Sequence, residues 1–173
     1  VSGGPYTPAP SGGHTGRFGG SRPTSSRRRT RALTFMNIIV CIKRVPSTTT
    51  AIKVADDGVS IDGSGVEYEL NTYDEFAVEQ ALQTKEAVGE GEVTVVTRGT
   101  SDAIKELRDC LARGADKAVL LKHEGRSDAF ATAEMLAAWL GTQNPDVIFM
   151  GKQAVDSDNS QVPQRVATIL GFG

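Results

Sequence analysis

Residues 37–42 read Asn-Ile-Ile-Val-Cys-Ile, an apolar run without the alternation of a half-buried strand. Such a run is typical of a strand buried on both faces, as in a parallel sheet covered by helices. Further strand-like runs follow at 92–97, 118–121 and 146–150, and helical patterns separate them. This alternation, with right-handed crossovers, predicts an α/β fold with a doubly wound, mostly parallel sheet.

The helical segments carry start and stop signals. Thr72 and Glu75 have the spacing of a capping box at the start of the first helix, with Asn71 as the alternative cap. Gly89 to Gly91 end this first helical pattern. Ser101 can cap the second helix, and Gly114 lies where its C-cap is expected. Ser127-Asp128 open the third.

The segment between the first strand and the first helix differs from this pattern. Pro46 lacks the N–H that a central strand needs, so we expect the first strand to end there. Asp57-Gly58 is a hairpin signal between the short alternating pieces 52–54 and 59–61, and a third piece lies at 66–70. These features predict a small antiparallel excursion at an edge.

Residues 1–35 differ in composition from the rest of the chain. They hold six Arg and no acid, a charge of +6, whereas residues 36–173 hold 13 basic and 21 acidic residues, a charge of −8. We predict a disordered low-complexity extension before an α/β domain at 36–173. It is interpreted as a nucleic-acid-binding arm, a mitochondrial transit peptide, or an upstream extension; the last is favoured because a strand follows Met36 directly.

The composition excludes several classes of protein. The 173 residues suit one domain, and 39% hydrophobic with 23% charged residues is ordinary for a soluble globular protein. No apolar run approaches the roughly 18 residues of a membrane span. Cys41 and Cys110 lie far apart in the sequence, so we expect no disulfide framework, no metal site and a reducing, intracellular setting. We expect a cytoplasmic location for a bacterial protein, or the mitochondrial matrix if the extension is a transit peptide.

Common catalytic motifs are missing. The sequence has no GxGxxG after a strand, no GxxxxGK[ST] loop and no GxSxG elbow. His123 is the only histidine after Met36, and we expect it to be an ordinary surface residue. The sequence therefore predicts a protein without catalytic residues of its own.

The carboxyl ends of the strands are the expected place for a ligand, because doubly wound sheets bind ligands there. Gly151 could let the backbone approach a ligand closely, and the polar loop 151–161 leads into a helix start that attracts anions. Lys43 and Arg44 could meet a phosphate. The structural alternatives, a capped helix and solvated charges, remain open. The strand ends in question lie at 41–43, 97–99 and 151–153.

Four blocks of sequence occur in a fixed order, at 37–46, 71–82, 111–118 and 151–162. The most specific is the last, which begins Gly-Lys-Gln-Ala-Val-Asp. Together these blocks resemble the beta subunit of electron transfer flavoprotein across residues 36–173. Residues 1–35 match nothing in that family.

The resemblance implies a Rossmann-like, adenine-nucleotide-binding domain within a heterodimer. In this family FAD sits mainly on the alpha subunit, and the beta subunit holds a structural AMP, or a second FAD in electron-bifurcating members. The heterodimer carries electrons from flavin dehydrogenases, such as the acyl-CoA dehydrogenases of fatty acid beta-oxidation, to a membrane quinone oxidoreductase. The beta subunit is an electron carrier subunit, with neither nucleic acid nor direct membrane insertion implied.

The resemblance also implies nucleotide contacts at the strand ends and the last loop. These are Cys41, Asn71, Thr72, Tyr73, Asp74, Arg98, Gly151, Lys152, Gln153, Ala154, Val155, Asp156, Ser157, Asp158, Asn159, Ser160, Gln161 and Val162. The chain departs from the family pattern at four places. Thr72 stands where Pro is usual, Arg98 where a small residue is common, and Pro163 where Gly is usual; Ser157 is a mild change.

Family beta subunits continue beyond the last residues of this sequence into an arm that embraces the alpha subunit and carries a dehydrogenase-recognition loop. We therefore expect a fragment of a longer protein. The alternative is a stand-alone adenine-nucleotide-binding module of the stress-protein type, but its late glycine-rich phosphate loop is missing here.

Overall fold

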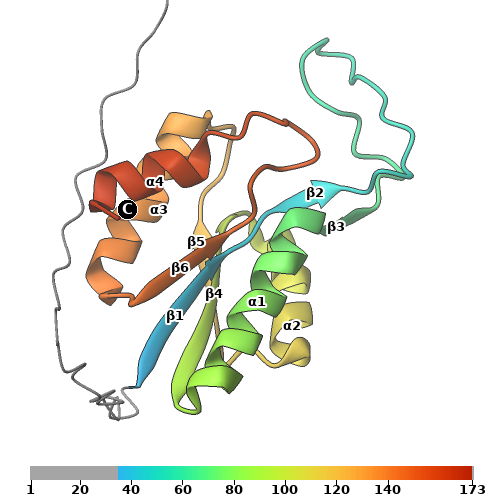
Figure 1. Ribbon diagram of the computed structural model, residues 1–173. Helices are drawn as coiled ribbons and strands as arrows, with labels where there is room; N and C mark the ends of the chain where they lie inside the picture. Colours follow the sequence, from blue (N-terminus) through green and yellow to red (C-terminus); the bar gives the residue numbers. More distant parts are fainter. Residues whose placement is uncertain (1–34, 173) are drawn as a thin grey trace, which may run out of the picture. The chain divides into compact units, whose positions relative to one another are not determined.

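The computed structural model describes residues 35–172, and its centre is a four-stranded sheet (Figure 1). The strands run in the order β5-β4-β1-β6, and every pairing is parallel. This confirms the predicted α/β fold with a doubly wound sheet. The strands are β1 (Met36–Cys41), β4 (Gly91–Gly99), β5 (Lys117–Lys122) and β6 (Val147–Met150).

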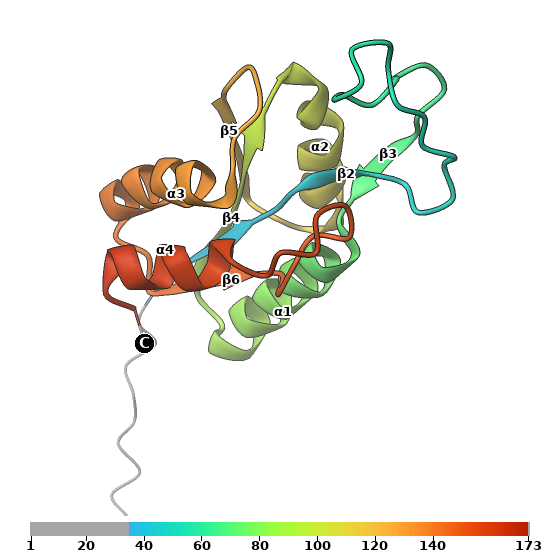
Figure 2. The same cartoon turned by 90° about the horizontal axis from the view of Figure 1, so that it is seen from above.

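Two helices cover each face of the sheet (Figure 2). One face is covered by α1 (Thr72–Val88) and α2 (Ile104–Arg113), and the other by α3 (Ala129–Gln143) and α4 (Val162–Leu170). Successive residues of β1 belong to opposite cores, Ile38 and Val40 to the first and Ile39 and Cys41 to the second. A strand that fills both cores needs the continuous apolar run with which the domain begins.

The predicted helix ends are confirmed, and the starts only in part. Gly89 and Gly114 are C-caps in the left-handed region, with φ of 87° and 119°. Asp128 caps α3, because its carboxylate accepts a hydrogen bond from the Ala131 N–H at 2.8 Å.

Two of the predicted caps are wrong. Asn71 is the N-cap of α1, but no side chain caps that helix, so the capping box of Thr72 and Glu75 is not formed. Glu75 instead pairs with Arg113 of α2. Ser101 begins the short 3₁₀ turn η1 (Ser101–Ala103), and α2 starts after Ala103 without a side-chain cap.

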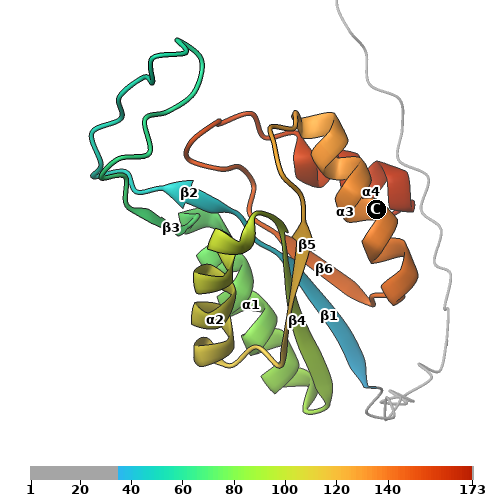
Figure 3. The same ribbon diagram turned by 180° about the vertical axis from the view of Figure 1, so that it is seen from behind.

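The predicted antiparallel excursion forms, but of the three predicted pieces only the one at 66–70 contains a strand. Its strands are β2 (Arg44–Pro46) and β3 (Tyr68–Leu70), so the segment around Pro46 continues as a short strand of a second sheet. The expected hairpin at Asp57-Gly58 is reduced to one isolated bridge, Val54 with Ile61. The loop between β2 and β3 projects away from the main sheet in Figure 3.

Among residues 35–172, no helix is long and apolar enough to span a bilayer, and no group of three or more His, Cys, Asp or Glu side chains is placed to hold a metal ion. The extension predicted at 1–35 lies, apart from Phe35, outside the described part of the chain.

Candidate functional site

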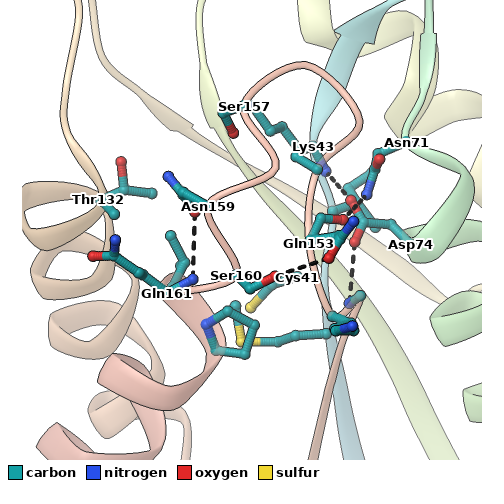
Figure 4. A pocket seen from close by; sticks show the side chains of 18 of the residues that line it. Cys41, Lys43, Asn71, Asp74, Thr132, Gln153, Ser157, Asn159, Ser160 and Gln161 are labelled. Carbon is teal, nitrogen blue, oxygen red and sulfur yellow. Dashed lines mark hydrogen bonds between the residues drawn. The ribbon is translucent and has the colours of Figure 1, made fainter. Parts of the chain in front are cut away.

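A cavity of about 150 Å³ lies where the predicted strand ends meet. It is bounded by the residues that follow β1 and β6, by Arg98 near the end of β4, and by the first turns of α3 and α4. In Figure 4, Thr132 of α3 lies on one side and Asn71 and Asp74 on the other, with the β6–α4 loop between them. The crevice is therefore at the carboxyl edge, beside the switch point between β1 and β6.

The structure brings most of the predicted site residues to this cavity. Those that line it are Cys41, Asn71, Asp74, Arg98, Gly151, Lys152, Gln153, Ala154, Ser157, Asn159, Ser160, Gln161 and Val162. Five predicted residues do not line it: Thr72, Tyr73, Val155, Asp156 and Asp158. Thr72 and Tyr73 are exposed on the first turn of α1, which turns only Asn71 and Asp74 inward.

Asn71 ties the start of α1 to the β6–α4 loop. Its side chain is only 1% exposed. The amide nitrogen donates to the carbonyl of Gln153 at 2.9 Å, and the amide oxygen accepts from the N–H of Val155 at 3.1 Å. The Asn71 side chain thus holds the loop in place, and Val155 contributes its backbone N–H to this contact without lining the cavity.

Asp74 joins the ends of β1 and β6. One carboxylate oxygen accepts from the Lys43 N–H at 2.8 Å, and the other accepts from the Gly151 N–H at 3.1 Å. Burial raises the pKa of Asp74 to about 6, although hydrogen bonds from Asn71, Lys43 and Gly151 oppose that rise. Both oxygens are engaged, so Asp74 organises the backbone around the cavity.

Gly151 is needed for packing inside the protein. A Cβ on this residue would lie 2.8 Å from the carbonyl carbon of Tyr73 and 2.9 Å from the nitrogen of Asp74. Real Cβ atoms essentially never approach backbone so closely. Gly151 thus makes a close backbone approach to the first turn of α1, and it also lines the cavity, so the predicted approach to a ligand stays a prediction.

The β6–α4 loop is stabilised by its own side chains. The Ser160 hydroxyl donates to the Gln153 side chain at 2.9 Å, and the Gln153 amide donates to the Asp158 carboxylate. Asp158 and Ser160 both adopt positive φ, 50° and 47°. At the rim, the Lys43 ammonium lies 2.7 Å from the carboxylate of Asp156. Asp156 thus closes the loop onto the end of β1 without lining the cavity.

Cys41 is the apolar floor of the site. Its side chain is buried, and burial, with a smaller contribution from the Asp74 charge, raises the pKa of the thiol to about 12. A thiol with this pKa stays protonated at neutral pH, so Cys41 packs as a small apolar group.

Arg98 reaches from β4 to the segment before α3. Its Nη2 donates to the carbonyl of Gly125 at 2.9 Å and to the hydroxyl of Ser127 at 2.6 Å. His123 is half-buried, with Nε2 3.4 Å from the same hydroxyl, and it does not line the cavity. The hydrogen bonds of Arg98 do not involve the β6–α4 loop. Arg98 therefore places its positive charge on the other side of the cavity, next to the start of α3.

Several lining residues were missed as site residues. They are Ile42, Lys43, Ala129, Thr132, Leu136, Met150 and Pro163. Lys43 was expected only as a candidate phosphate contact. The three α3 residues share one helix face at 129, 132 and 136, and the signal that could have found them is the Asp128 cap, which marks a helix start at the carboxyl edge.

Comparison with known proteins agrees with this geometry. The model of the electron transfer flavoprotein domain matches residues 58–173. The chain is 37% identical over 137 residues to electron transfer flavoprotein subunit beta of Bradyrhizobium diazoefficiens, covering 79% of this chain and 55% of that one.

Two relatives with other names are similar to the same degree. The protein FixA of Sinorhizobium fredii is 43% identical over 142 residues, covering 78% of this chain and 49% of its own. The acryloyl-CoA reductase electron transfer subunit gamma of Anaerotignum propionicum is 39% identical over 142 residues, covering 79% and 52%. The chain spans about half the length of these curated relatives.

The family match covers most of the described residues, including the whole β6–α4 loop. This match favours the electron transfer flavoprotein domain over the alternative of a stand-alone adenine-nucleotide-binding module of the stress-protein type. The chain therefore belongs to the electron transfer flavoprotein family, and within it resembles the beta subunits.

Proposed function

We propose that this chain is the nucleotide-binding part of an electron transfer flavoprotein beta subunit and that its cavity holds AMP. The observation that carries the proposal is the convergence of three strand ends and two helix starts on one cavity, in a chain of this family. Flat aromatic bases suit such crevices, and polar side chains fix their orientation.

The donor set of the cavity fits an adenine nucleotide. Asn159 and Gln161 bring side-chain amides, which both donate and accept hydrogen bonds, as the edge of a base or a ribose hydroxyl requires. The first turns of α3 and α4 present backbone N–H groups suited to phosphate. Cys41, Leu136 and Met150 supply an apolar surface for the ring.

We further propose that the protein acts as an electron carrier with an alpha subunit that holds FAD. The flavin supplies the redox chemistry, and the residues of this chain bind and position. The proposed donors are flavin dehydrogenases such as acyl-CoA dehydrogenases, and the proposed acceptor is a membrane quinone oxidoreductase. In this proposal the chain supplies the nucleotide cavity, and other parts of the complex recognise the dehydrogenases and the quinone oxidoreductase.

A second FAD in the AMP position is the alternative. The chain is as similar to FixA and to the acryloyl-CoA reductase subunit as it is to the named beta subunit. Neither of these two relatives is named a beta subunit of electron transfer flavoprotein, which is why we retain the second-FAD alternative. The ADP half of FAD presents the same adenine, ribose and phosphate to the cavity as AMP does. The two ligands therefore make the same demands on the residues named above.

The deciding experiment is co-expression of the complete gene with a neighbouring alpha-subunit gene. A yellow complex that releases one FAD and one AMP on denaturation supports the proposal. Two FAD and no AMP establishes the alternative. A colourless monomer that binds ATP overturns both. We propose that the protein is located in the cytoplasm or the mitochondrial matrix. Fractionation of cells of the native host that express the gene tests this location.

A further inference from the structure

The two halves of the β6–α4 loop are held in different ways. The first half, residues 151–155, is anchored by the buried side chains of Asn71 and Asp74, which bind its backbone. The second half, residues 156–161, has only exposed or half-buried side chains, and none of them belongs to either core. The second half therefore lacks the buried contacts that fix the first.

The second half of the loop has a single polar attachment to the sheet. Among residues 35–172, the Lys43–Asp156 ion pair is the only hydrogen bond or ion pair that joins residues 156–161 to anything except the loop itself and α4. The Lys43 ammonium lies 2.7 Å from each carboxylate oxygen of Asp156. Because Lys43 directly follows the end of β1, this pair ties the outer part of the loop to the central sheet.

The same half of the loop forms a wall of the cavity. Four of its residues line the cavity, namely Ser157, Asn159, Ser160 and Gln161. In Figure 4, Asn159 and Gln161 lie on the side of α3, and Lys43 lies on the side of α1. A movement of this half away from Lys43 would therefore open the cavity, while the first half of the loop stays anchored.

The closed position of this half is only weakly stabilised. Asp158 and Ser160 adopt left-handed φ angles of 50° and 47°, a region that is unfavourable for residues other than glycine. The side chains of Lys43 and Asp156 are 46% and 28% exposed, and exposed ion pairs are weak and are screened by salt. A contact of this strength keeps a segment closed and still allows it to open.

We propose that residues 156–161 form a lid over the cavity and that the Lys43–Asp156 ion pair is the latch of this lid, so that its opening sets the rate at which the nucleotide enters and leaves. The inference rests on the proposed function, since the nucleotide is the ligand assigned to the cavity. It goes further by naming the segment that moves and the contact that resists the movement. The latch joins two groups of the protein, so it acts on the rates of exchange rather than on the affinity.

The test measures nucleotide exchange in the complete protein with its partner subunit. Bound radiolabelled AMP is chased with an excess of unlabelled AMP, and binding of AMP to the nucleotide-free complex gives the rate of entry. Asp156→Asn should speed both release and entry about two- to fivefold, the range of an exposed ion pair. Because both rates rise together, the dissociation constant should change less than about twofold. If the complex holds a second FAD, the exchange of that FAD is measured instead.

Lys43→Gln separates a latch from a direct effect of charge on the nucleotide. The nucleotide is an anion, so Asp156→Asn removes a repelling charge and Lys43→Gln removes an attracting one. Direct effects of these charges would change the release rate in opposite directions, whereas loss of a latch speeds release in both variants. The double variant should release AMP no faster than the faster single variant, because the pair can be broken only once.

Salt gives a readout that needs no variant. Raising NaCl from about 0.05 M to about 0.5 M should speed release from the unmodified protein about two- to fivefold, since salt screens the exposed pair. Asp156→Asn should respond less, because it has no latch to screen. Glu92→Gln is the matched control: it breaks an ion pair with Lys117 on the neighbouring strand, outside the cavity, and its exchange rates should equal those of the unmodified protein.

The outcomes separate this inference from the proposed function. A complete protein that binds neither AMP nor a second FAD overturns the proposed function and the lid with it. If nucleotide binds but exchanges equally fast in Asp156→Asn and the unmodified protein, or if the two single variants shift release in opposite directions, the site stands and the latch is wrong. Faster exchange in both single variants, with Glu92→Gln unchanged, supports the inference.

Discussion

Asp74 is the residue of the site whose charge responds to mild acid. Its pKa is raised to about 6 by burial, against an unfolded value of about 3.9. Between these two values the folded protein binds more protons than the unfolded chain, so stability falls as pH rises from about 4 to about 6. The full cost of ionising Asp74, up to about 3 kcal/mol, is present above pH 6.

Asp74→Asn removes this titration. The variant loses one acceptor for a backbone N–H, which destabilises it by about 1–3 kcal/mol at low pH. We expect that deficit relative to the unmodified protein to shrink by about 1–3 kcal/mol between pH 4.5 and pH 7, as measured by urea unfolding. Parallel pH profiles for the two proteins would contradict the assignment.

Asp116→Asn is the matched control. Burial raises the pKa of Asp116, but the Lys85 ammonium and the Val93 N–H outweigh it, so its pKa is lowered overall. A carboxyl group with a lowered pKa contributes stability that is lost on acidification. The deficit of Asp116→Asn should therefore grow, rather than shrink, as pH rises.

At the scale of elements, the β6–α4 loop and α1 meet backbone to backbone at Gly151. Gly151→Ala places a Cβ within 3 Å of Tyr73 and Asp74, so either the loop or the helix must shift. We expect a loss of about 2 kcal/mol in stability, typical of overpacking, together with weaker nucleotide binding. Gly63→Ala is the control, because nothing lies within 4 Å of its Cβ position and its φ is not positive. Equal stability of the two variants would show that the contact is not tight.

The small sheet is attached to α2 by a buried ion pair. Glu106 is 1% exposed, and its carboxylate lies 3.4 Å from Nε of Arg44, which also stacks over Tyr68 at 3.7 Å. Neither carboxylate oxygen has a hydrogen bond among the described residues. Such a pair is costly to break but cheap to replace with apolar groups.

A double-mutant cycle tests this attachment. Arg44→Met leaves the buried carboxylate uncompensated and should destabilise the protein by about 3 kcal/mol or more. Arg44→Met with Glu106→Met should recover most of that loss, measured by urea unfolding. If the two substitutions simply add, the pair is not coupled.

The sequence predicted the elements better than their connections. The run at 37–42 predicts a strand buried on both faces because one face alone would show alternation, and β1 does fill two cores. The first strand also ends before Pro46 as predicted, but the sequence does not reveal that Arg44–Pro46 pairs in a separate sheet, where an edge position tolerates the missing N–H. Pairing partners depend on contacts distant in sequence, which periodicity does not contain.

The site was predictable where it follows strand ends, and less so where it depends on packing. Gly151 and Asn71 are predicted from the sequence, but their packing against α1 and the β6–α4 loop is not, because those contacts join residues distant in sequence. The wall formed by α3 was missed because an apolar and small-residue helix face reads as core until the sheet order is known.

At the scale of the whole molecule, the cavity joins elements that otherwise belong to two separate cores. Residues after β1 and β6, Asn71 and Asp74 at the start of α1, and the starts of α3 and α4 all line it. A ligand there can bind only when all of them are in place, so it binds the folded state and not the unfolded chain. Ligand binding should therefore stabilise the whole folded domain against global unfolding, rather than one local segment.

We expect AMP at 100 times its dissociation constant to stabilise the nucleotide-free complete protein by about 2.7 kcal/mol. That corresponds to a rise of roughly 5–10 °C in Tm, measured by calorimetry or dye-free fluorescence. Asn71→Ala releases the loop from α1 without touching the wall at α3, so it should lower the AMP affinity and shift the response to higher AMP concentration. Thr72→Ala, at an exposed neighbour outside the cavity, should respond like the unmodified protein. A Tm that does not change at saturating AMP would mean that the cavity is not a nucleotide site, because a ligand held by both cores cannot bind the folded protein without stabilising it.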